Sequence, residues 1–356
     1  MSKLFKEITS EKNIYEAYKQ TLKGDTKYTQ KALIFRMNET YNLMKLRKRI
    51  IKDEYEFDEY IKFYVYEPKE RLIHAPTFKD KIVQILIYNE LKKIYFPSFI
   101  YDSYSCIDGK GTHACAKRIQ HFLRKAKWKF DDPYILKLDI KKFFYSINRE
   151  IFKEMLPKKI KCKKTLNLFH KIIDSADSIS PKGLPLGNTM SQLGSNIYMD
   201  KFDKFIKRKL SIKFYVRYAD DMFLVLKNKK EARKIFKISK KFINTELDLK
   251  LNKDKSKIFP MAQGVNGIGY KIHPTHMLLR NDSKKRVKRK LKAMPKLIKN
   301  GRLKKEKAEQ MLNSWKGHAD YASSYNFYQK LIKKHDFLEL KDDKFCVREE
   351  YIDGYK

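Results

Sequence analysis

Two adjacent carboxylates lie between two apolar runs in the segment FYVRYADDMFLVL, which spans residues 214–226. The flanking residues are β-branched, aromatic or otherwise apolar, so the segment predicts two strands joined by a tight turn that carries Asp220 and Asp221. Two like charges held this close repel each other unless a cation neutralises them. We therefore expect the turn to bind a divalent metal ion with carboxylate oxygens, as Mg²⁺ prefers.

A third carboxylate, Asp139, follows the apolar residues of a strand expected over residues 134–140. A charge in such surroundings loses hydration, and a partner must compensate for that loss. Taken alone, Asp139 is explained equally well by an ion pair with Lys141 or Lys142 and by a bound metal. The acidic turn after residue 218 favours the metal.

Carboxylates from separate strands that share two divalent ions form a two-metal phosphoryl-transfer centre. We expect Asp139 and Asp220 to bind both ions, Asp221 to be an outer or partial ligand, and the carbonyl of Ile140 to complete one ion's shell. Both ions are expected to be Mg²⁺, with Mn²⁺ as a substitute. In this mechanism a primer 3′-hydroxyl attacks the α-phosphate of a nucleotide, and the protein adds no nucleophile. The sequence thus predicts a nucleic-acid polymerase.

The charge of the chain predicts a polyanionic partner. It has 81 Lys and Arg against 42 Asp and Glu, a formal charge of +39 over 356 residues. Because 42% of the residues are hydrophobic and 13% aromatic, this charge is expected to coat a folded body. No run of about 18 apolar residues and no signal peptide is apparent, so we expect no membrane partner and a cytoplasmic location.

The elements that must position these residues predict an α+β fold. Cysteines 106, 115, 162 and 346 lack the spacing of a zinc site and are expected to be reduced and mostly buried. His273 and His276 are expected to flank a turn at Pro274 without a metal. The expected elements are helices over residues 1–60, a strand over 61–66, helices over 80–96 and 114–127, a strand–helix–hairpin–helix–strand series over 134–258, and basic helices from 281 onward.

These motifs occur in an order that resembles the prokaryotic reverse transcriptases. LKLDIKKFFYSI matches the first palm motif, GLPLGNTMSQLGSNIYMDKFD the second, YVRYADDMFLVL the third, and LDLKLNKDKSKI and GVNGIGYKI the fourth and fifth. The likeness extends through YVYEPKERLIHAPTFKDKIVQ and DSYSCIDGKGTH upstream and SWKGHADYASSYN downstream. Each motif alone is weak, but the ordered series is specific. It implies a right-hand polymerase with fingers over residues 1–130, a palm of antiparallel sheet and helices over 131–280, and a basic helical thumb with a C-terminal tail over 281–356.

The resemblance implies roles for residues around the incoming nucleotide. Phe144 stands at the position of a steric gate against a 2′-hydroxyl, which favours DNA synthesis, and one of Phe143 and Phe144 is expected to pack in the core. Lys69 and Arg71 are expected to hold the triphosphate, although ordinary surface charge explains Lys69 nearly as well. Lys255 matches a general acid for pyrophosphate, with Lys253 and Lys257 close enough in sequence to compete.

The second motif is expected to bring backbone and side chains to the nucleotide, since glycine permits close approach at positions 183 and 187. Leu186, Gly187 and Gln192 are the expected contacts. Retroviral and group II intron enzymes carry Gln where Leu186 stands and Ser-Pro where Ser191 and Gln192 stand. The form found here resembles the enzymes of diversity-generating retroelements and of phage defence, and it predicts low fidelity.

The last part of the chain is expected to hold nucleic acid. Residues 284–307 contain thirteen Lys or Arg and one acid, Glu306, and cations on such a helix bind phosphates without sequence preference. The turn over residues 267–270 resembles a primer grip. Trp315 and His318 are expected to close a helix–helix contact, whereas His113 is as consistent with a template contact as with a structural role. The expected nucleic-acid contacts are Lys284, Lys285, Arg286, Lys288, Arg289 and Lys292.

The expected partners are a noncoding RNA template, an RNA–DNA hybrid, deoxynucleoside triphosphates and an accessory protein, because no RNase H, endonuclease or maturation domain is expected after the thumb. We favour antiphage defence over a diversity-generating retroelement. A template-independent polymerase, or one primed from one of the 23 tyrosines, is an alternative. An RNA-binding chaperone is a weaker one, because it would have no reason to keep Asp139, Asp220 and Asp221.

Overall fold

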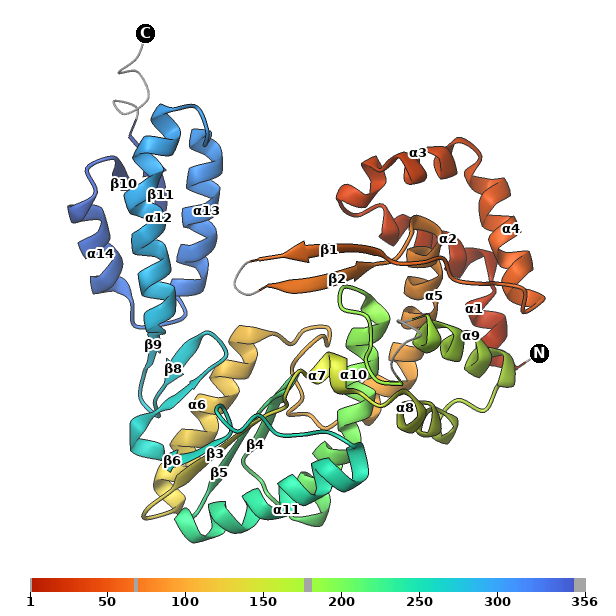
Figure 1. Cartoon of the computed structure of the whole chain (residues 1–356). Helices are drawn as coiled ribbons and strands as arrows, with labels where there is room; N and C mark the ends of the chain where they lie inside the picture. The colour runs from red at the N-terminus through yellow and green to blue at the C-terminus, as the bar shows by residue number, and fades with distance from the viewer. Residues whose placement is uncertain (1, 67–69, 176–180, 349–356) are drawn as a thin grey trace. The chain divides into compact units, whose positions relative to one another are not determined.

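The computed structural model describes residues 2–66, 70–175 and 181–348. Figure 1 labels the helices and strands of the chain. The chain divides into two compact units whose residues alternate along the sequence. The first unit comprises residues 1–109, 138–222 and 234–256, and the second comprises residues 110–137, 223–233 and 257–356. The boundaries of these two units differ from those expected for fingers, palm and thumb. The division into fingers, palm and thumb therefore remains a prediction.

The first unit begins with the helices expected over residues 1–60. These are α1 (Lys3–Ile8), α2 (Glu11–Thr21), α3 (Gln30–Met37) and α4 (Glu39–Ile51). Hydroxyl caps start three of them, because the oxygens of Ser2, Ser10 and Thr29 accept backbone N–H groups that the first helical turn leaves free. Ile14 and Ala17 of α2 are buried, and their spacing places them on one face of the helix.

The strand expected at residues 61–66 is β1 (Ile61–Val65), which pairs antiparallel with β2 (Arg71–Ala75). Every side chain of β1 is exposed. The next helix, α5 (Phe78–Tyr95), packs against α2 and α10 and buries residues around most of its circumference. It therefore lies in the interior of its unit.

The segment that carries the motifs contains a four-stranded sheet with the strand order β4-β5-β3-β6. Its strands are β3 (Tyr134–Asp139), β4 (Tyr215–Tyr218), β5 (Asp221–Leu226) and β6 (Lys257–Pro260). β3 and β6 are antiparallel, with Tyr134 opposite Pro260. The helices of this segment are α7 (Phe143–Ser146), α8 (Arg149–Met155), α9 (Lys163–Asp174), α10 (Thr189–Lys204) and α11 (Lys229–Leu247). The expected series of strands and helices over residues 134–258 is confirmed.

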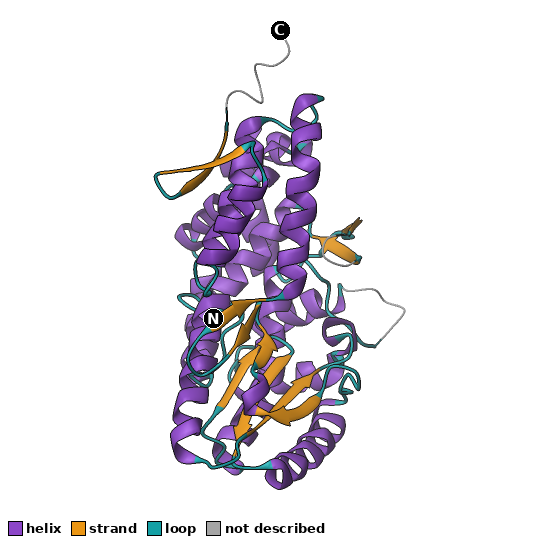
Figure 2. Ribbon diagram, turned by 90° about the vertical axis from the view of Figure 1, so that its left-hand side faces the viewer, coloured by secondary structure: helices purple, strands orange, loops and turns teal. Residues whose placement is uncertain are grey.

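The second unit contains α6 (Thr112–Lys129) and a small antiparallel sheet of β7 (Val265–Gly267), β8 (Tyr270–Ile272) and β9 (Met277–Leu279). Three helices follow: α12 (Asn281–Lys299), α13 (Lys305–Ala319) and α14 (Tyr325–Lys334). They share a core with β10 (Leu338–Lys341) and β11 (Lys344–Val347), an antiparallel hairpin seen beside the helices in Figure 2.

This hairpin corrects the expectation of helices and a tail after residue 281. Its turn residues, Asp342 and Asp343, both have positive φ, at 46° and 59°. Such a two-residue turn usually carries Asn-Gly or Asp-Gly, so the acidic pair gave no turn signal. Phe345 and Val347 are buried in the core with the helices, which explains why the chain returns here.

The cysteines are free thiols, as expected. Only Cys115 is buried, however, and Cys106 is exposed, so the expectation that most are buried was wrong. His273 and His276 stack on each other at 4.7 Å across the connection between β8 and β9. None of the described helices is long and apolar enough to cross a membrane.

Candidate active site

The acidic turn joins β4 and β5 as the sequence predicted. Ala219 and Asp220 form the turn, and Asp221 is the first residue of β5. Ala219 has φ of 52°, a left-handed conformation that costs free energy in a residue with a side chain. The surrounding structure must therefore hold this turn in place.

The three carboxylates lie close enough to interact. The pKa of Asp220 is raised to about 6, because its carboxyl group is buried and lies near the negative charges of Asp221 and then Asp139. Asp139 is itself only 2% exposed. The structure thus brings together, within one unit, acids that lie some 80 residues apart in the sequence.

Asp139 is fixed by the segment that follows α11. Its N–H donates to the hydroxyl of Ser256 at 3.2 Å, and its carbonyl accepts the N–H of Asn252 at 2.8 Å. Its Oδ2 atom pairs with Nζ of Lys255 at 2.9 Å, so the partner is neither Lys141 nor Lys142. The other oxygen, Oδ1, is buried and accepts no hydrogen bond from any described residue.

These side chains fit a divalent cation. One carboxylate oxygen is buried without a donor, and the neighbouring carboxyl group has a pKa raised by burial and then by like charges. Together they leave negative charge that a cation would compensate. The described residues contain no group of three His, Cys, Asp or Glu side chains already arranged as ligands. The oxygens of Asp139, Asp220 and Asp221 are the donors that would hold Mg²⁺ or Mn²⁺, and the ligand set remains a prediction.

Beneath the turn lies an ion pair that the sequence analysis missed. The Arg217 guanidinium donates to both carboxylate oxygens of Asp203, at 2.7 to 2.9 Å, and both side chains are fully buried. Arg217 also donates to Asn196 Oδ1 at 3.0 Å, to Ser103 Oγ at 2.9 Å and to the carbonyl of Ala219 at 3.1 Å. An arginine in the middle of an apolar strand was the signal that could have revealed it.

This ion pair explains how the strained turn is held. Taking two charges out of water is costly, so a buried pair is better evidence for a fixed geometry than for extra stability. The bond from Arg217 to the carbonyl of Ala219 acts on the residue directly before Asp220. We infer that Arg217 is a positioning residue for the acidic turn.

Lys255 is the lysine that reaches the acids. The pKa of its ammonium group is raised, first by the hydrogen bond to Asp139 and also by the charges of Asp139, Asp220 and Asp221. No ion pair or hydrogen bond to Asp139 is present for the described neighbours Lys253 and Lys257. The position of the Lys255 ammonium group next to Asp139 agrees with a proton donor, and its role as general acid stays a prediction.

The first and second motifs contact each other through backbone. Phe143 is buried and Phe144 is half-buried, as expected if one of them packs in the core. The N–H of Leu184 donates to the carbonyl of Phe144 at 2.8 Å, and that of Gly183 donates to Ile147 at the same distance. The structure thus places the expected steric gate beside the second motif.

Gly187 is needed for a contact that the sequence did not predict. It has φ of 107°, and a Cβ atom there would lie 2.7 Å from Cγ2 of Ile73. The N–H of His74 donates to the carbonyl of Leu186 at 2.7 Å, which joins β2 to this loop. The close approach is therefore to β2, while any contact of Leu186 or Gly187 with a nucleotide remains a prediction.

Two of the other expected nucleotide contacts, Arg71 and Gln192, lie on described elements and are exposed. Arg71 is exposed at the start of β2, two residues before Ile73. Gln192 is exposed in the first turn of α10. Lys69 lies outside the described residues. These roles stay predictions.

In the second unit the expected primer-grip turn leads into a cluster of aromatic side chains. Tyr270 Oη lies 2.8 Å from His113 Nδ1 and 2.9 Å from both Nδ1 and the carbonyl oxygen of His318. His113 stacks on Tyr321 at 3.7 Å, so its contacts are those of a packed structural residue. A Cβ atom at Gly269 would lie 2.8 Å from the His318 ring, which explains the glycine beside Tyr270.

The cations of α12 divide over several faces. Lys284 and Lys288 lie over the ring of Phe327 at 5.5 and 5.6 Å. Lys285, Arg286, Arg289 and Lys292 are exposed, and Arg286 also lines a cavity against α13. Trp315 Nε1 donates to Ser283 Oγ at 3.2 Å, which confirms the expected helix–helix contact.

Comparison with known proteins shows the family of this chain. The family described as reverse transcriptase (RNA-dependent DNA polymerase) matches residues 66–272, more than half of the chain. The chain therefore belongs to this family. The site residues Asp139, Asp220, Asp221 and Lys255 all lie within the matched region.

The similar curated proteins are distant and longer. The group II intron-encoded protein LtrA of Lactococcus lactis is 24% identical over 272 residues, covering 57% of this chain and 44% of LtrA. Protein YkfC of Escherichia coli is 23% identical over 256 residues, covering 58% and 65% respectively. A putative intron 2 protein of COX1/OXI3 from Saccharomyces cerevisiae is 23% identical over 259 residues, covering 55% and 30%. The aligned region is thus between 30% and 65% of each relative's length.

A solved structure supports the fold. Apo telomerase from Candida tropicalis matches with a TM-score of 0.50 and 13% identity, covering 83% of this chain and 64% of that one. The expected α+β fold of right-hand polymerase type is confirmed. The narrower resemblance to enzymes of diversity-generating retroelements or phage defence is not confirmed by these relatives.

Proposed function

We propose that this protein is an RNA-directed DNA polymerase that extends a primer with deoxynucleotides by two-metal phosphoryl transfer. The observation that carries the proposal is the convergence of Asp139, Asp220 and Asp221, expressed in the raised pKa of Asp220 and the orphaned Oδ1 of Asp139. Membership of the reverse transcriptase family supports it. A nucleic-acid chaperone would gain nothing from burying these acids together.

The residues of the chain divide the chemistry among them. Two Mg²⁺ ions, held by Asp139 and Asp220 with Asp221 and the Ile140 carbonyl, would activate the primer hydroxyl and stabilise the leaving pyrophosphate. Arg217 keeps the turn in the conformation that points the carboxylates inward. Lys255 donates a proton to the pyrophosphate.

Substrate selection is proposed for residues near the first and second motifs. The half-buried ring of Phe144 excludes a 2′-hydroxyl, so deoxynucleotides are preferred. Arg71 binds the triphosphate from β2, with Lys69 as a second cation. Leu186, Gly187 and Gln192 face the nascent base pair, where the apolar Leu186 lowers fidelity.

The basic face of α12 is proposed to hold the product duplex. The exposed cations Lys285, Arg289 and Lys292 contact phosphates of an RNA–DNA hybrid without sequence preference. We further propose a noncoding RNA as template, an accessory protein as partner, a cytoplasmic location and a role in antiphage defence. The net charge of +39 supports a nucleic-acid partner and leaves its identity open.

Primer extension tests the proposal. The purified chain should extend a DNA primer on an RNA template with Mg²⁺ and deoxynucleotides, and Asp220→Asn should reduce the rate at least about a thousandfold. Asp254→Asn is the matched control, because Asp254 is exposed in the turn next to Lys255 and should leave the rate unchanged. Equal activity of Asp220→Asn and Asp254→Asn would refute the catalytic assignment.

Omitting components separates the alternatives. Extension without any template would favour a template-independent polymerase, and labelled DNA that stays attached to the protein would favour priming from tyrosine. Sequencing of copurifying RNA and DNA distinguishes the biological roles. An adjacent structured RNA copied into DNA supports the defence proposal, whereas an adjacent variable repeat supports a diversity-generating retroelement.

A further inference from the structure

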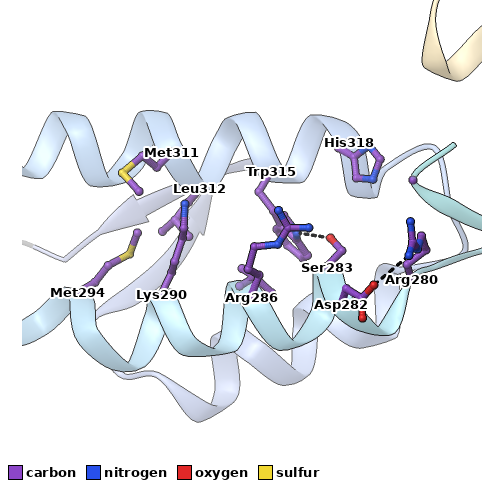
Figure 3. Close-up of a pocket in the computed structure, with 12 residues that line it drawn as sticks. Arg280, Asp282, Ser283, Arg286, Lys290, Met294, Met311, Leu312, Trp315 and His318 are labelled. Carbon is purple, nitrogen blue, oxygen red and sulfur yellow. Dashed lines mark hydrogen bonds and ion pairs between the residues drawn. The ribbon is translucent and has the colours of Figure 1, made fainter. Parts of the chain in front are cut away.

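A cavity of about 390 Å³ lies between α12 and α13, within the second unit. Figure 3 shows Met294 and Lys290 of α12 facing Met311 and Leu312 of α13, with Trp315 further along the same groove. Its volume falls in the range of roughly 300–1,000 Å³ that small-molecule sites occupy. The cavity is therefore large enough for a group of nucleotide size and too small for a duplex.

The polar groups of the cavity favour an anion. Arg280, Arg286 and Lys290 contribute three positive charges and Asp282 one negative charge, which leaves two positive charges. The carboxylate of Asp282 is engaged by Arg280 at 2.9 Å. Among the described residues, no carboxylate pairs with Arg286 or Lys290. Two cations are thus available to a bound phosphate.

His318 adds no charge that would change this balance at neutral pH. Burial lowers the pKa of its imidazole, and the nearby charges of His113 and Arg286 lower it further. Its ring stacks on Tyr270 at 4.5 Å, so it forms a fixed wall at one end of the cavity. The cations that face the cavity without a described carboxylate partner are therefore Arg286 and Lys290.

The apolar wall favours a planar, polarisable group next to that anion. Met294 and Leu312 are buried in the core beneath the cavity, whereas Met311 and Trp315 are partly exposed. The bond from Trp315 Nε1 to Ser283 fixes the indole ring. Thioether and indole surfaces bind flat aromatic groups well. A nucleotide combines both features, because its phosphate is an anion and its base is a flat aromatic ring.

A nucleotide fits better than an acidic helix from a protein partner. A helix docks through apolar anchors spaced along a continuous groove. Here the cations Arg286 and Lys290 interrupt the apolar strip between Trp315 and Met294, so successive anchors would meet charge (Figure 3).

We propose that this cavity binds one unpaired nucleotide of a single-stranded nucleic acid, with the base against Met294, Met311 and Trp315 and the phosphate between Arg286 and Lys290. The inference rests on the proposed function, which brings nucleic acid to α12. It separates Arg286 and Lys290 from the outer cations Lys285 and Arg289. Lys285 and Arg289 contact phosphates alone. Arg286 and Lys290 bind the phosphate of the nucleotide whose base lies in the cavity.

Binding to two oligonucleotides tests the cavity. A five-nucleotide RNA and the same RNA with an abasic site at its third position are titrated against the full chain at one salt concentration. The base-bearing RNA should bind about tenfold more tightly, as expected for one base held against aromatic and apolar side chains. Equal affinities would overturn the proposal and favour an acidic protein segment as the occupant.

Two matched double variants test whether the tighter binding of the base-bearing RNA depends on the cavity. Arg286→Gln with Lys290→Gln should bring the affinity ratio close to one. Lys285→Gln with Arg289→Gln removes the same charge from the outer face, and it should weaken both RNAs while keeping the ratio. Met311→Gln, on a partly exposed wall, should also lower the ratio without loss of folding, which circular dichroism would check. If both double variants keep the ratio, the cavity is not the binding site.

Fluorescence gives a readout that does not depend on the oligonucleotides. Trp315 and Trp128 are the two tryptophans, and Trp128 is 92% exposed. In Trp128→Phe, adenosine monophosphate should change the emission of Trp315, and inorganic phosphate alone should not. No response to the nucleotide would contradict the assignment.

The outcomes also separate this inference from the proposed function. An affinity ratio near ten without DNA synthesis would retain the cavity and refute the polymerase. Synthesis with a ratio of one would retain the polymerase and refute the cavity.

Discussion

Arg217 donates two hydrogen bonds through its Nε atom and one through its Nη2 atom to the carboxylate of Asp203, and neither side chain is accessible to solvent. Asp203 also accepts a hydrogen bond from the hydroxyl of Tyr215 at 2.6 Å. The same guanidinium reaches the carbonyl of Ala219, next to the carboxylates of the turn. One buried ion pair therefore connects Asp203 to the turn that carries the candidate catalytic acids.

Replacing Asp203 by Asn should destabilise the protein. The guanidinium of Arg217 would stay buried without a countercharge, which costs about 3–5 kcal/mol of the free energy of unfolding. Urea denaturation followed by circular dichroism measures the change. Glu246→Gln is the control, because Glu246 pairs with Lys201 at 2.6 Å on the exposed surface and should leave the midpoint unchanged. Equal midpoints for wild type and Asp203→Asn would contradict the prediction.

Arg217→Lys should lower kcat with little effect on the KM for nucleotide. Lysine keeps a positive charge near Asp203, but its single ammonium group lacks the planar fork that also reaches Ala219, Asn196 and Ser103. A displaced turn should cost roughly 10- to 100-fold in rate. Steady-state primer extension, at a temperature where denaturation shows the variant to be folded, separates the two constants. A rise in KM alone would assign Arg217 to nucleotide binding.

Removing the ammonium group of Lys255 should slow the chemical step. Lys255→Ala takes away both the partner of Asp139 and the proposed proton donor, so the single-turnover rate should fall about 10²- to 10⁴-fold. Lys253→Ala is the matched control two residues earlier, where the side chain is exposed. Similar rates for the two variants would remove Lys255 from the mechanism.

Acid should destabilise the cluster around Tyr270. Burial, and then nearby positive charge, lowers the pKa of His113 and of His318, so the folded chain binds fewer protons than the unfolded chain below the ordinary histidine pKa of about 6.5. Their contribution to stability is complete above pH 6.5 and is lost as the pH falls below that value.

Urea midpoints between pH 7.5 and 5.0 measure this effect. The charged and titratable groups nearby are Lys117, Arg286, Tyr270 and Tyr321. His318→Gln should flatten the pH dependence, whereas His276→Gln, an exposed residue between β8 and β9, should not. The same slope in wild type and His318→Gln would show that other groups control it.

Shortening the expected steric gate should admit ribonucleotides. Phe144→Ala removes a half-buried ring, so the ratio of kcat/KM for deoxynucleotides over ribonucleotides should fall by about 10- to 200-fold. Phe143→Leu tests the buried neighbour and should change stability and not this ratio. An unchanged ratio in Phe144→Ala would refute the gate.

Secondary-structure elements could be predicted from the sequence where the signal came from neighbouring residues. The apolar runs around Asp220 and Asp221 predicted the hairpin, and the helical patterns over residues 80–96 and from residue 281 onward predicted α5 and α12. Long-range partners were not predictable, because periodicity indicates which face is buried and not what covers it. Tyr270 and His113 lie 157 residues apart in sequence, and the ion pair of Lys255 with Asp139 spans 116.

The contact of Gly187 was missed for the same reason, since Ile73 belongs to a distant segment. The β10–β11 hairpin was missed for a different one. Its Asp342-Asp343 turn lacks the glycine that usually marks a two-residue hairpin turn.

The bond between His74 and Leu186 has a mechanical consequence. Because Gly187 leaves no space beside Ile73, the β1–β2 hairpin cannot shift without displacing the loop that ends at Asn188, the cap of α10. That helix also carries Asn196 and Asp203, which hold Arg217. Helix α10 thus connects the loop that contacts β2 to the side chains that hold the acidic turn.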